Sequence, residues 1–374
     1  MEILWLTPIQ AILFYILYGI SGVVPLIAAL YLLFRPCNAF SAEIKPPVRL
    51  RRWAAAFLGF SSLAHVWWVL FFVGSGNLKS MSYLLLCLTD SVLLLTTIAG
   101  TMLSMLQDRR RPIRPVLMAL IPFLVLSGIY FFHPSVPLKQ ITTSYLLLIC
   151  IVFTVCLVYA IRQYDRWLND NYADLEHKKV WLSQLVAFFC ILFIVLYIIS
   201  ENLVLIFCLH IVDLILIFLL VWRVETLPTL EEPPVSQAQA EKNATCHNRK
   251  EGQGCGSVDL ELIEQLLKAH CVAPQLYLEH DLTLQQLALA IGTNRSYLSQ
   301  FFSRHGITYN SYINNQRINH FVNRFHELTA AGESVCAQQL AQESGFRSYS
   351  TFSRAFTQRT GQSVTAWMRE EERC

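Results

Sequence analysis

Residues 283–304 read TLQQLALAIGTNRSYLSQFFSR, and this stretch decides the fold of the C-terminal third of the chain. Thr283 and Gln286 form a capping box, which opens a first short helix. Gly292 ends that helix, and Asn294 caps a second one. Two short helices joined by a tight turn with a glycine predict a helix-turn-helix, whose second helix enters the major groove of DNA.

The same pattern recurs about 53 residues later. Four apolar or glycine anchors repeat in order, with Leu287, Gly292, Leu298 and Phe302 matched by Leu340, Gly345, Phe352 and Phe356. A long helix, Tyr309 to Leu328, is predicted between the two copies. Its ~20 residues span roughly 30 Å, close to the ~34 Å of one DNA turn. Two recognition helices could therefore enter successive major grooves on one face of DNA.

These anchors, together with Gly306, Arg317, Ile318 and Gly361, resemble the DNA-binding domain of the AraC/XylS transcription regulators. The resemblance covers about residues 258–371, under a third of the chain. It implies a seven-helix domain with two helix-turn-helix motifs that regulates transcription in bacteria.

The candidate DNA contacts lie on the polar faces of the two second helices, opposite the apolar anchors. They are Arg295, Ser296, Gln300, Arg304, Ser350, Thr351, Arg354 and Gln358, with Arg347 just before the later helix. Arginine grips guanine or phosphate with two donors, whereas serine reads several bases weakly. Arg317 also enters the DNA-binding set, as a structural or backbone-phosphate anchor rather than a base reader.

The charge of this domain is nearly balanced. From residue 258 onward, ten Lys and Arg face eleven Asp and Glu, but neither predicted recognition helix contains an acid. A local basic face on a domain that is not basic predicts moderate affinity for DNA with a modest dependence on salt.

The N-terminal part has a different composition. The whole chain is 54% hydrophobic and only 15% charged, with a mean hydropathy of +0.43, which argues against a wholly soluble protein. Seven stretches are each near the ~20 apolar residues that cross a bilayer. They are Ile9–Phe34, Trp53–Val73, Met81–Met105, Pro115–Phe132, Ile141–Ile161, Val180–Ser200 and Leu203–Trp222. If the last hairpin, around Glu201, does not cross, six or five spans remain.

The distribution of Lys and Arg among the short loops predicts how the spans are oriented in the membrane. Thirteen lie in one set of loops and two, Lys79 and Lys139, in the other, which places the N-terminus outside and the C-terminus in the cytoplasm. The expected fold is all-α, with a transmembrane bundle over 1–222, a flexible linker over 223–257 and the DNA-binding domain over 258–374. The expected location is the bacterial inner membrane.

The ionisable side chains Asp90, His210 and Asp213 lie well inside predicted spans, and His65 lies in the second span. An acid at the centre of a span costs about 2.5–3.5 kcal/mol, so such a group needs a partner. His210 and Asp213 are three positions apart and can pair. Two roles are consistent with these side chains: a polar network that holds the helices together, or a pocket that binds a ligand. Catalysis is disfavoured, because Asp213 lacks the Gly-x-Gly-Asp context of intramembrane aspartyl proteases.

The sequence thus predicts a membrane-embedded, non-enzymatic transcription regulator whose bundle is a sensor or an anchor. Its expected partners are double-stranded DNA, the lipid bilayer and an unidentified small-molecule or membrane signal, with a homodimer and RNA polymerase left open. No cofactor is expected, and no metal, since Cys246, His247 and Cys255 lack a fourth ligand. The alternative is a membrane receptor or transporter-like protein whose C-terminal domain docks a protein partner.

Overall fold

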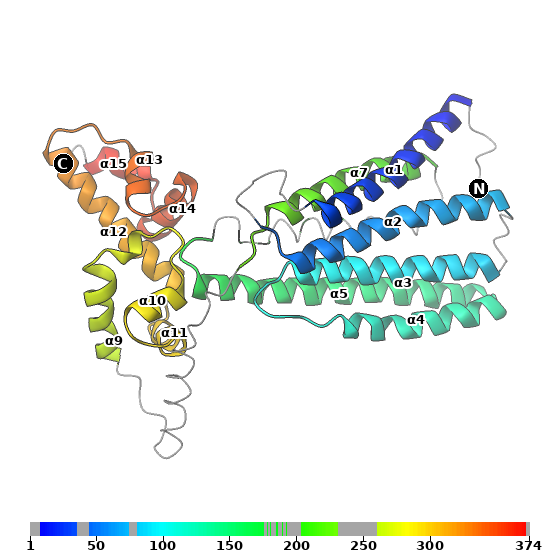
Figure 1. Cartoon of the computed structure of the whole chain (residues 1–374), viewed down its shortest axis with the longest axis horizontal. Helices are drawn as coiled ribbons and strands as arrows, with labels where there is room; N and C mark the ends of the chain where they lie inside the picture. The colour runs from blue at the N-terminus through cyan, green and yellow to red at the C-terminus, as the bar shows by residue number, and fades with distance from the viewer. Residues whose placement is uncertain are drawn as a thin grey trace, which may run out of the picture. The chain divides into compact units, whose positions relative to one another are not determined.

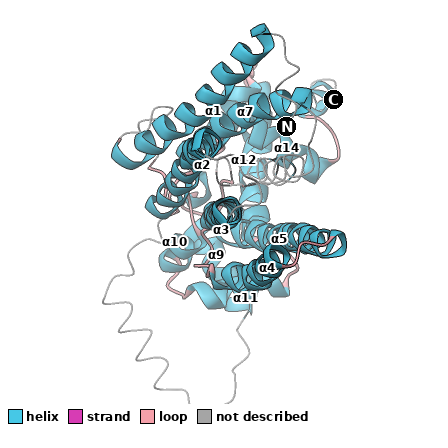
Figure 2. Cartoon of the chain, turned by 90° about the vertical axis from the view of Figure 1, so that its right-hand side faces the viewer, coloured by secondary structure: helices cyan, strands magenta, loops and turns pink. Residues whose placement is uncertain are grey.

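A computed structural model describes residues 8–35, 45–74, 81–175, 203–230 and 260–371, with a few isolated positions between 178 and 192. The regular elements in these ranges are helices (Figures 1 and 2), which confirms the all-α fold class. The chain divides into two compact units. The first comprises Met1–Tyr164 and His177–Leu230, and the second comprises Asp165–Glu176 and Glu231–Cys374.

The first unit contains long apolar helices. They are α1 (Pro8–Phe34), α2 (Val48–Gly74), α3 (Met81–Ser104), α4 (Arg114–Phe132), most of α5 (Val136–Asn171) and α7 (Leu203–Thr226). Among the described residues, α1, α2, α4 and α5 are long and apolar enough to cross a membrane, and α3 holds a shorter apolar stretch. The expected span Val180–Ser200 and the Glu201 hairpin lie outside the described residues, so the count of seven spans stays a prediction.

Apolar side chains on these helices point outward as well as inward. Ile12, Leu70 and Met118, on three different helices, are each more than half exposed. A helix that is apolar all round suits hydrocarbon as its solvent, because water would penalise its outer face. The composition of the first unit is therefore that of a membrane bundle.

The basic loops of the first unit meet at one end of the bundle. Arg51, near the start of α2, pairs with Glu225 at the end of α7, with 3.6 Å between Nε and Oε1. Tyr31, near the end of α1, donates to the same carboxylate at 3.2 Å. Arg49 donates to the carbonyl oxygen of Arg111, in the loop after α3, at 3.0 Å. The loops that the charge bias assigns to one side of the membrane are thus physically together.

The first residues of the expected linker, 223–230, belong to the helical bundle in the structure. α7 continues past Trp222 to Thr226, and the residues after it are held by the bundle. The backbone N–H of Thr229 donates to the carbonyl oxygen of Lys45 at 2.9 Å, and that of Leu230 donates to Gln107 at 2.9 Å. The residues from 231 to 259, with Cys246, His247 and Cys255, lie outside the described residues. The division of the chain at 222 and 257 stays a prediction.

The second unit contains seven α-helices in its described residues, as the family resemblance implies. They are α9 (Leu260–Leu267), α10 (Leu284–Ala290), α11 (Arg295–Arg304), α12 (Tyr309–Ala330), α13 (Ala337–Glu343), α14 (Tyr349–Thr360) and α15 (Val364–Glu371). The first helix is shorter than the expected Val258–Cys271, because Lys268–Val272 form a π-helical turn.

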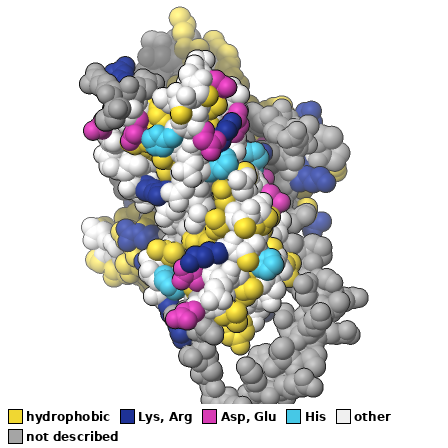
Figure 3. Space-filling model, turned by 90° about the vertical axis from the view of Figure 1, so that its left-hand side faces the viewer, with side chains coloured by type: hydrophobic (Ala, Val, Ile, Leu, Met, Phe, Trp, Pro, Cys, Tyr) yellow, Lys and Arg dark blue, Asp and Glu magenta, His cyan; other side chains and the backbone are white. Residues whose placement is uncertain are grey.

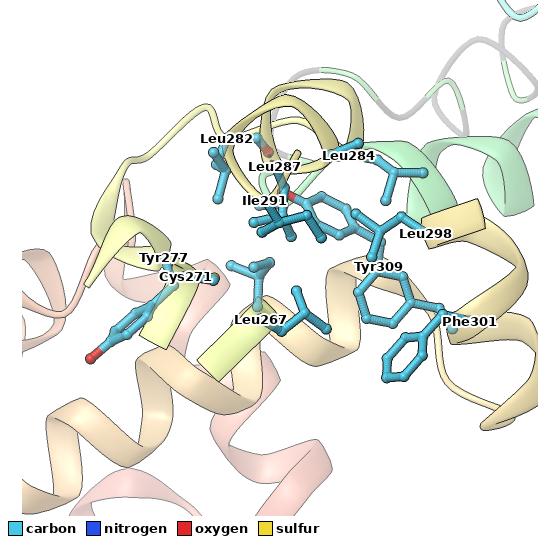
Figure 4. Close-up of a cluster of buried hydrophobic side chains, with 14 of the residues drawn as sticks. Leu267, Cys271, Tyr277, Leu282, Leu284, Leu287, Ile291, Leu298, Phe301 and Tyr309 are labelled. Carbon is cyan, nitrogen blue, oxygen red and sulfur yellow. Dashed lines mark hydrogen bonds between the residues drawn. The ribbon is translucent and has the colours of Figure 1, made fainter. Parts of the chain in front are cut away.

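Two hydrophobic clusters hold the second unit. In the first, Leu287 of α10 and Leu298 of α11 meet Tyr309 of α12 (Figure 4). In the second, Phe321 of α12 packs with Phe352 of α14 and with residues of α13 and α15. α12 contributes to both clusters, so one rigid helix fixes the two halves of the unit relative to each other.

Candidate nucleic-acid interface

The first helix-turn-helix has the local structure that its sequence predicts. Thr283 Oγ1 accepts from the N–H of Gln286 at 3.2 Å, and Gln286 Oε1 accepts from the N–H of Thr283 at 2.7 Å, which confirms the capping box. Gly292 adopts φ +74°, a left-handed conformation that ends α10 at little cost only for glycine. Asn294 caps α11 by accepting from the N–H of Tyr297 at 2.8 Å.

The second helix-turn-helix repeats this plan with other residues. Gly345 adopts φ +87° in the turn between α13 and α14. Ser348 caps α14 by accepting from the N–H of Thr351 at 3.3 Å. Phe352 and Phe356 are fully buried against Phe321. The apolar anchors of both motifs are therefore core residues, as predicted, and the opposite faces of α11 and α14 are left for a partner.

Most predicted contact residues lie on those opposite faces. Ser296, Gln300 and Arg304 are exposed on α11, and Ser350, Arg354 and Gln358 are exposed on α14, whereas Arg295 and Thr351 are half-buried. The face of α14 forms a shallow hollow lined by Tyr349, Ser350, Ser353, Arg354, Thr357 and Gln358. Sequence reasoning missed Tyr349, Ser353 and Thr357. Their spacing of four residues, which puts them on one helical face, was the signal that could have found them.

Arg317 is a correction to the predicted set. Its side chain is only 1% exposed, so it cannot contact DNA in this structure. Its Nε donates to the carbonyl oxygen of Tyr277 at 2.7 Å, and a terminal nitrogen donates to that of Glu279 at 2.6 Å. Burial lowers the pKa of the guanidinium to about 10, which leaves it charged at neutral pH. Of the two anchoring roles considered, the structural one holds, because the guanidinium is buried inside the second unit and donates to carbonyl oxygens there.

Two other arginines near the second motif are engaged within the unit. Arg347, half exposed, pairs with Asp281, with 3.5 Å between the nitrogen and the carboxylate oxygen. Arg359 donates to the carbonyl oxygen of Asn315 at 2.8 Å and to the side chain of Asn319 at 2.6 Å. Arg359 thus ties the end of α14 to α12, whereas Arg347 would exchange its surface partner Asp281 for a phosphate at little cost.

The charges of the second unit are interspersed. On the face that Figure 3 presents, Lys and Arg alternate with Asp, Glu and His rather than forming one continuous basic patch. Because the unit also has ten Lys and Arg against eleven Asp and Glu from residue 258 onward, its non-specific attraction to the phosphate backbone is expected to be limited.

The candidate intramembrane residues Asp90 and His210 have different partners in the first unit. Asp90 of α3 accepts from the indole N–H of Trp68 of α2. His210 of α7, only 5% exposed, lies in a ring cluster with Tyr18 and His65, at centroid distances of 5.6 Å and 6.1 Å. Tyr18 was not singled out from the sequence, and His65 was noted inside the second span but not placed in the candidate site. The structure gives Asp90 and His210 partners on neighbouring helices, whereas the pairing of His210 with Asp213 stays a prediction.

Comparison with known families supports the reading of the second unit. Residues 287–370 match the family model described as a helix-turn-helix domain, of the AraC type. The matched segment spans both motifs and the helix between them, and it supports an AraC-type DNA-binding domain in this part of the chain. No curated protein and no solved structure matches the chain. Within the described residues, no cluster of three metal-ligating side chains is found.

Proposed function

We propose that the protein is a membrane-embedded transcription regulator that binds DNA sequence-specifically through α11 and α14, with the apolar helices as its sensor or anchor in the bacterial inner membrane. The observation that carries the proposal is the pair of capped recognition helices, each with a buried apolar face and an exposed polar face, joined by α12. A rigid pair of this kind fits two successive major-groove segments. Nothing in this role requires catalysis, a cofactor or a metal.

The direct test is genome-wide mapping of DNA crosslinked to the intact protein in its own host. The wild-type chain should enrich discrete sites, and Arg354→Ala should lose them, because Arg354 lies exposed on α14 and can grip a guanine or a phosphate. The matched control is Arg324→Ala, since the side chain of Arg324 is 42% exposed but belongs to α12, where it pairs with Glu327, and not to a recognition helix. The control should keep the wild-type sites.

The alternative function, a membrane receptor whose C-terminal domain docks a protein, predicts the opposite result in this experiment. The wild-type chain would then enrich no discrete DNA sites, and chemical crosslinking would join α14 to a protein instead. The polar, arginine-bearing character of both recognition faces favours DNA. A protein-docking surface of similar size would be expected to carry more apolar and aromatic side chains at its centre.

A further inference from the structure

The second unit includes a segment that is distant in sequence, Asp165–Glu176, which follows the apolar part of α5. Tyr172, Ala173 and Asp174 in this segment are buried, with exposed fractions of 8%, 1% and 3%. Ala173 belongs to the same hydrophobic cluster as Leu298 of α11. The segment is therefore a packed part of the helix-turn-helix unit and not a loose connection.

Backbone pairing holds this segment. The N–H of Ala173 donates to the carbonyl oxygen of Leu282 at 3.2 Å, and Tyr172 forms an antiparallel bridge with Thr283. Asn310, in the first turn of α12, donates from its side chain to the carbonyl oxygen of Tyr172 at 3.2 Å and to that of Ala173 at 2.6 Å. Leu282 and Thr283 lead directly into α10, so the segment is bound where the first motif begins.

The segment also engages the first recognition helix. Arg295 Nε donates to the side-chain oxygen of Asn171, the last residue of α5, at 2.9 Å. Arg295 is the first residue of α11, and residues at the start of a recognition helix contact base edges. The major groove is about 12 Å wide, and one α-helix with its side chains is about 10–12 Å across. A groove filled by α11 therefore leaves little room for the end of α5 beside the first residue of α11.

We propose that the surface formed by Leu282, Thr283, Arg295 and Asn310 is a docking site for the chain's own segment Asn171–Asp174, and that DNA competes with this segment for the start of α11. The proposal rests on the proposed DNA-binding function. Because α5 is a candidate membrane span that runs without interruption to Asn171, a shift of α5 would pull the segment away or hold it in place. A membrane signal then reaches the recognition helix through a few helical residues rather than through the polar stretch after Leu230.

The chain offers a matched pair of variants for the test. Asn171 and Asn169 each donate to a backbone carbonyl four residues earlier, at 2.6 Å and 2.7 Å, but only Asn171 also accepts from Arg295. The full chain is placed in nanodiscs of phosphatidylethanolamine with phosphatidylglycerol. Its affinity is measured by fluorescence anisotropy with a labelled mixed-sequence duplex of about 40 base pairs, roughly four turns. Asn171→Ala should bind about tenfold more tightly than wild type, since a hydrogen bond to a charged group is lost from the competing state. Asn169→Ala should bind as wild type does.

Amide hydrogen exchange at Ala173 reports docking independently of DNA affinity. The amide should be protected in the wild-type chain without DNA, and should exchange faster both in Asn310→Ala and in the presence of saturating duplex. Competition is wrong if Ala173 stays protected in the DNA complex, or if Asn171→Ala binds no more tightly than Asn169→Ala. If neither the wild-type chain nor any variant binds the duplex, the proposed DNA-binding function is wrong, and the proposed competition is wrong for the same reason. Exchange of Ala173 without DNA then still shows whether docking itself occurs.

Discussion

A Cβ atom placed on Gly345 would lie 2.8 Å from both Cα and the carbonyl oxygen of Leu278. The turn of the second motif is thus pressed against the backbone that precedes the first motif, and the two halves of the second unit share this contact in addition to α12. Arg317 reaches the same place, because its Nε lies 3.1 Å from that hypothetical Cβ. The geometry of the two recognition helices depends on this junction.

Gly345→Ala should therefore lower the stability of the second unit by more than the cost of a strained backbone dihedral alone. An alanine at positive φ costs about 1 kcal/mol, and overlap with backbone that cannot move aside adds about 1–3 kcal/mol. Gly361→Ala is the control, since Gly361 has φ +79° but open space around its Cβ position. The free energy of opening, from amide hydrogen exchange over residues 260–371 of the full chain, separates the two. Equal losses in both variants would show that the Leu278 contact adds nothing.

Arg317→Met should cost about 3–5 kcal/mol of opening free energy in the same measurement. The variant leaves the buried carbonyl group of Tyr277 and the partly buried carbonyl group of Glu279 without their donor. Arg317→Lys should recover only part of the loss, because an ammonium cannot reproduce the planar fork. Arg324→Met, which removes an exposed arginine from the same helix, should change stability by about 0.5 kcal/mol or less. A loss at Arg317 as small as that at Arg324 would contradict the structural role.

Acidification should weaken the second unit through His320. Burial lowers the pKa of this imidazole below its usual 6.5, and the nearby Arg324 lowers it further. The unfolded chain then binds the proton more readily, so stability is full above about pH 6.5 and is lost as the pH falls through the folded pKa. The opening free energy should drop between about pH 7 and pH 5, and should drop less in His320→Gln. Parallel pH profiles for the two chains would rule out His320 as the cause.

DNA binding by the full chain should depend only modestly on salt. Four arginines on or directly before the two recognition helices, Arg295, Arg304, Arg347 and Arg354, neutralise at most about four phosphates, so a plot of log affinity against log salt should have a slope of about −4 or shallower. Arg304→Ala should reduce the slope by about one if Arg304 contacts a phosphate. A slope near −10 would show that further cations, outside these two helices, carry the binding.

Topology can be read with reporter fusions to the full-length sequence. Fusions after Arg52, Arg114 and Arg223 should report the cytoplasm, because the basic loops that meet at one end of the bundle follow the positive-inside rule. Fusions near Gly76 and Pro137 should report the outside. A cytoplasmic signal at Glu201 would remove the last hairpin, and an external signal at Arg223 would separate the second unit from the genome.

The sequence by itself determined the two motifs, the long helix between them and the caps of the first motif. Capping boxes, left-handed glycines and apolar spacing act over about one to three helical turns, so Thr283, Gly292 and Asn294 could be assigned their roles without knowing what surrounds them. The buried faces of α11 and α14 followed from the same spacing. Hydropathy over about 20 residues likewise predicted the apolar helices of the first unit.

Only the tertiary structure showed which residues that are far apart in the sequence contact each other. Arg317 stands in an ordinary helical position, and nothing near it in the sequence shows that its partners lie 40 and 38 residues earlier. The docking of Asn171 on Arg295 joins residues 124 positions apart. Hydrogen bonds between distant segments depend on how the helices pack, because packing and not local pattern sets which polar groups meet once water is excluded. For this reason the sequence could suggest which side chains are able to bind DNA, while the structure showed which of them are already engaged.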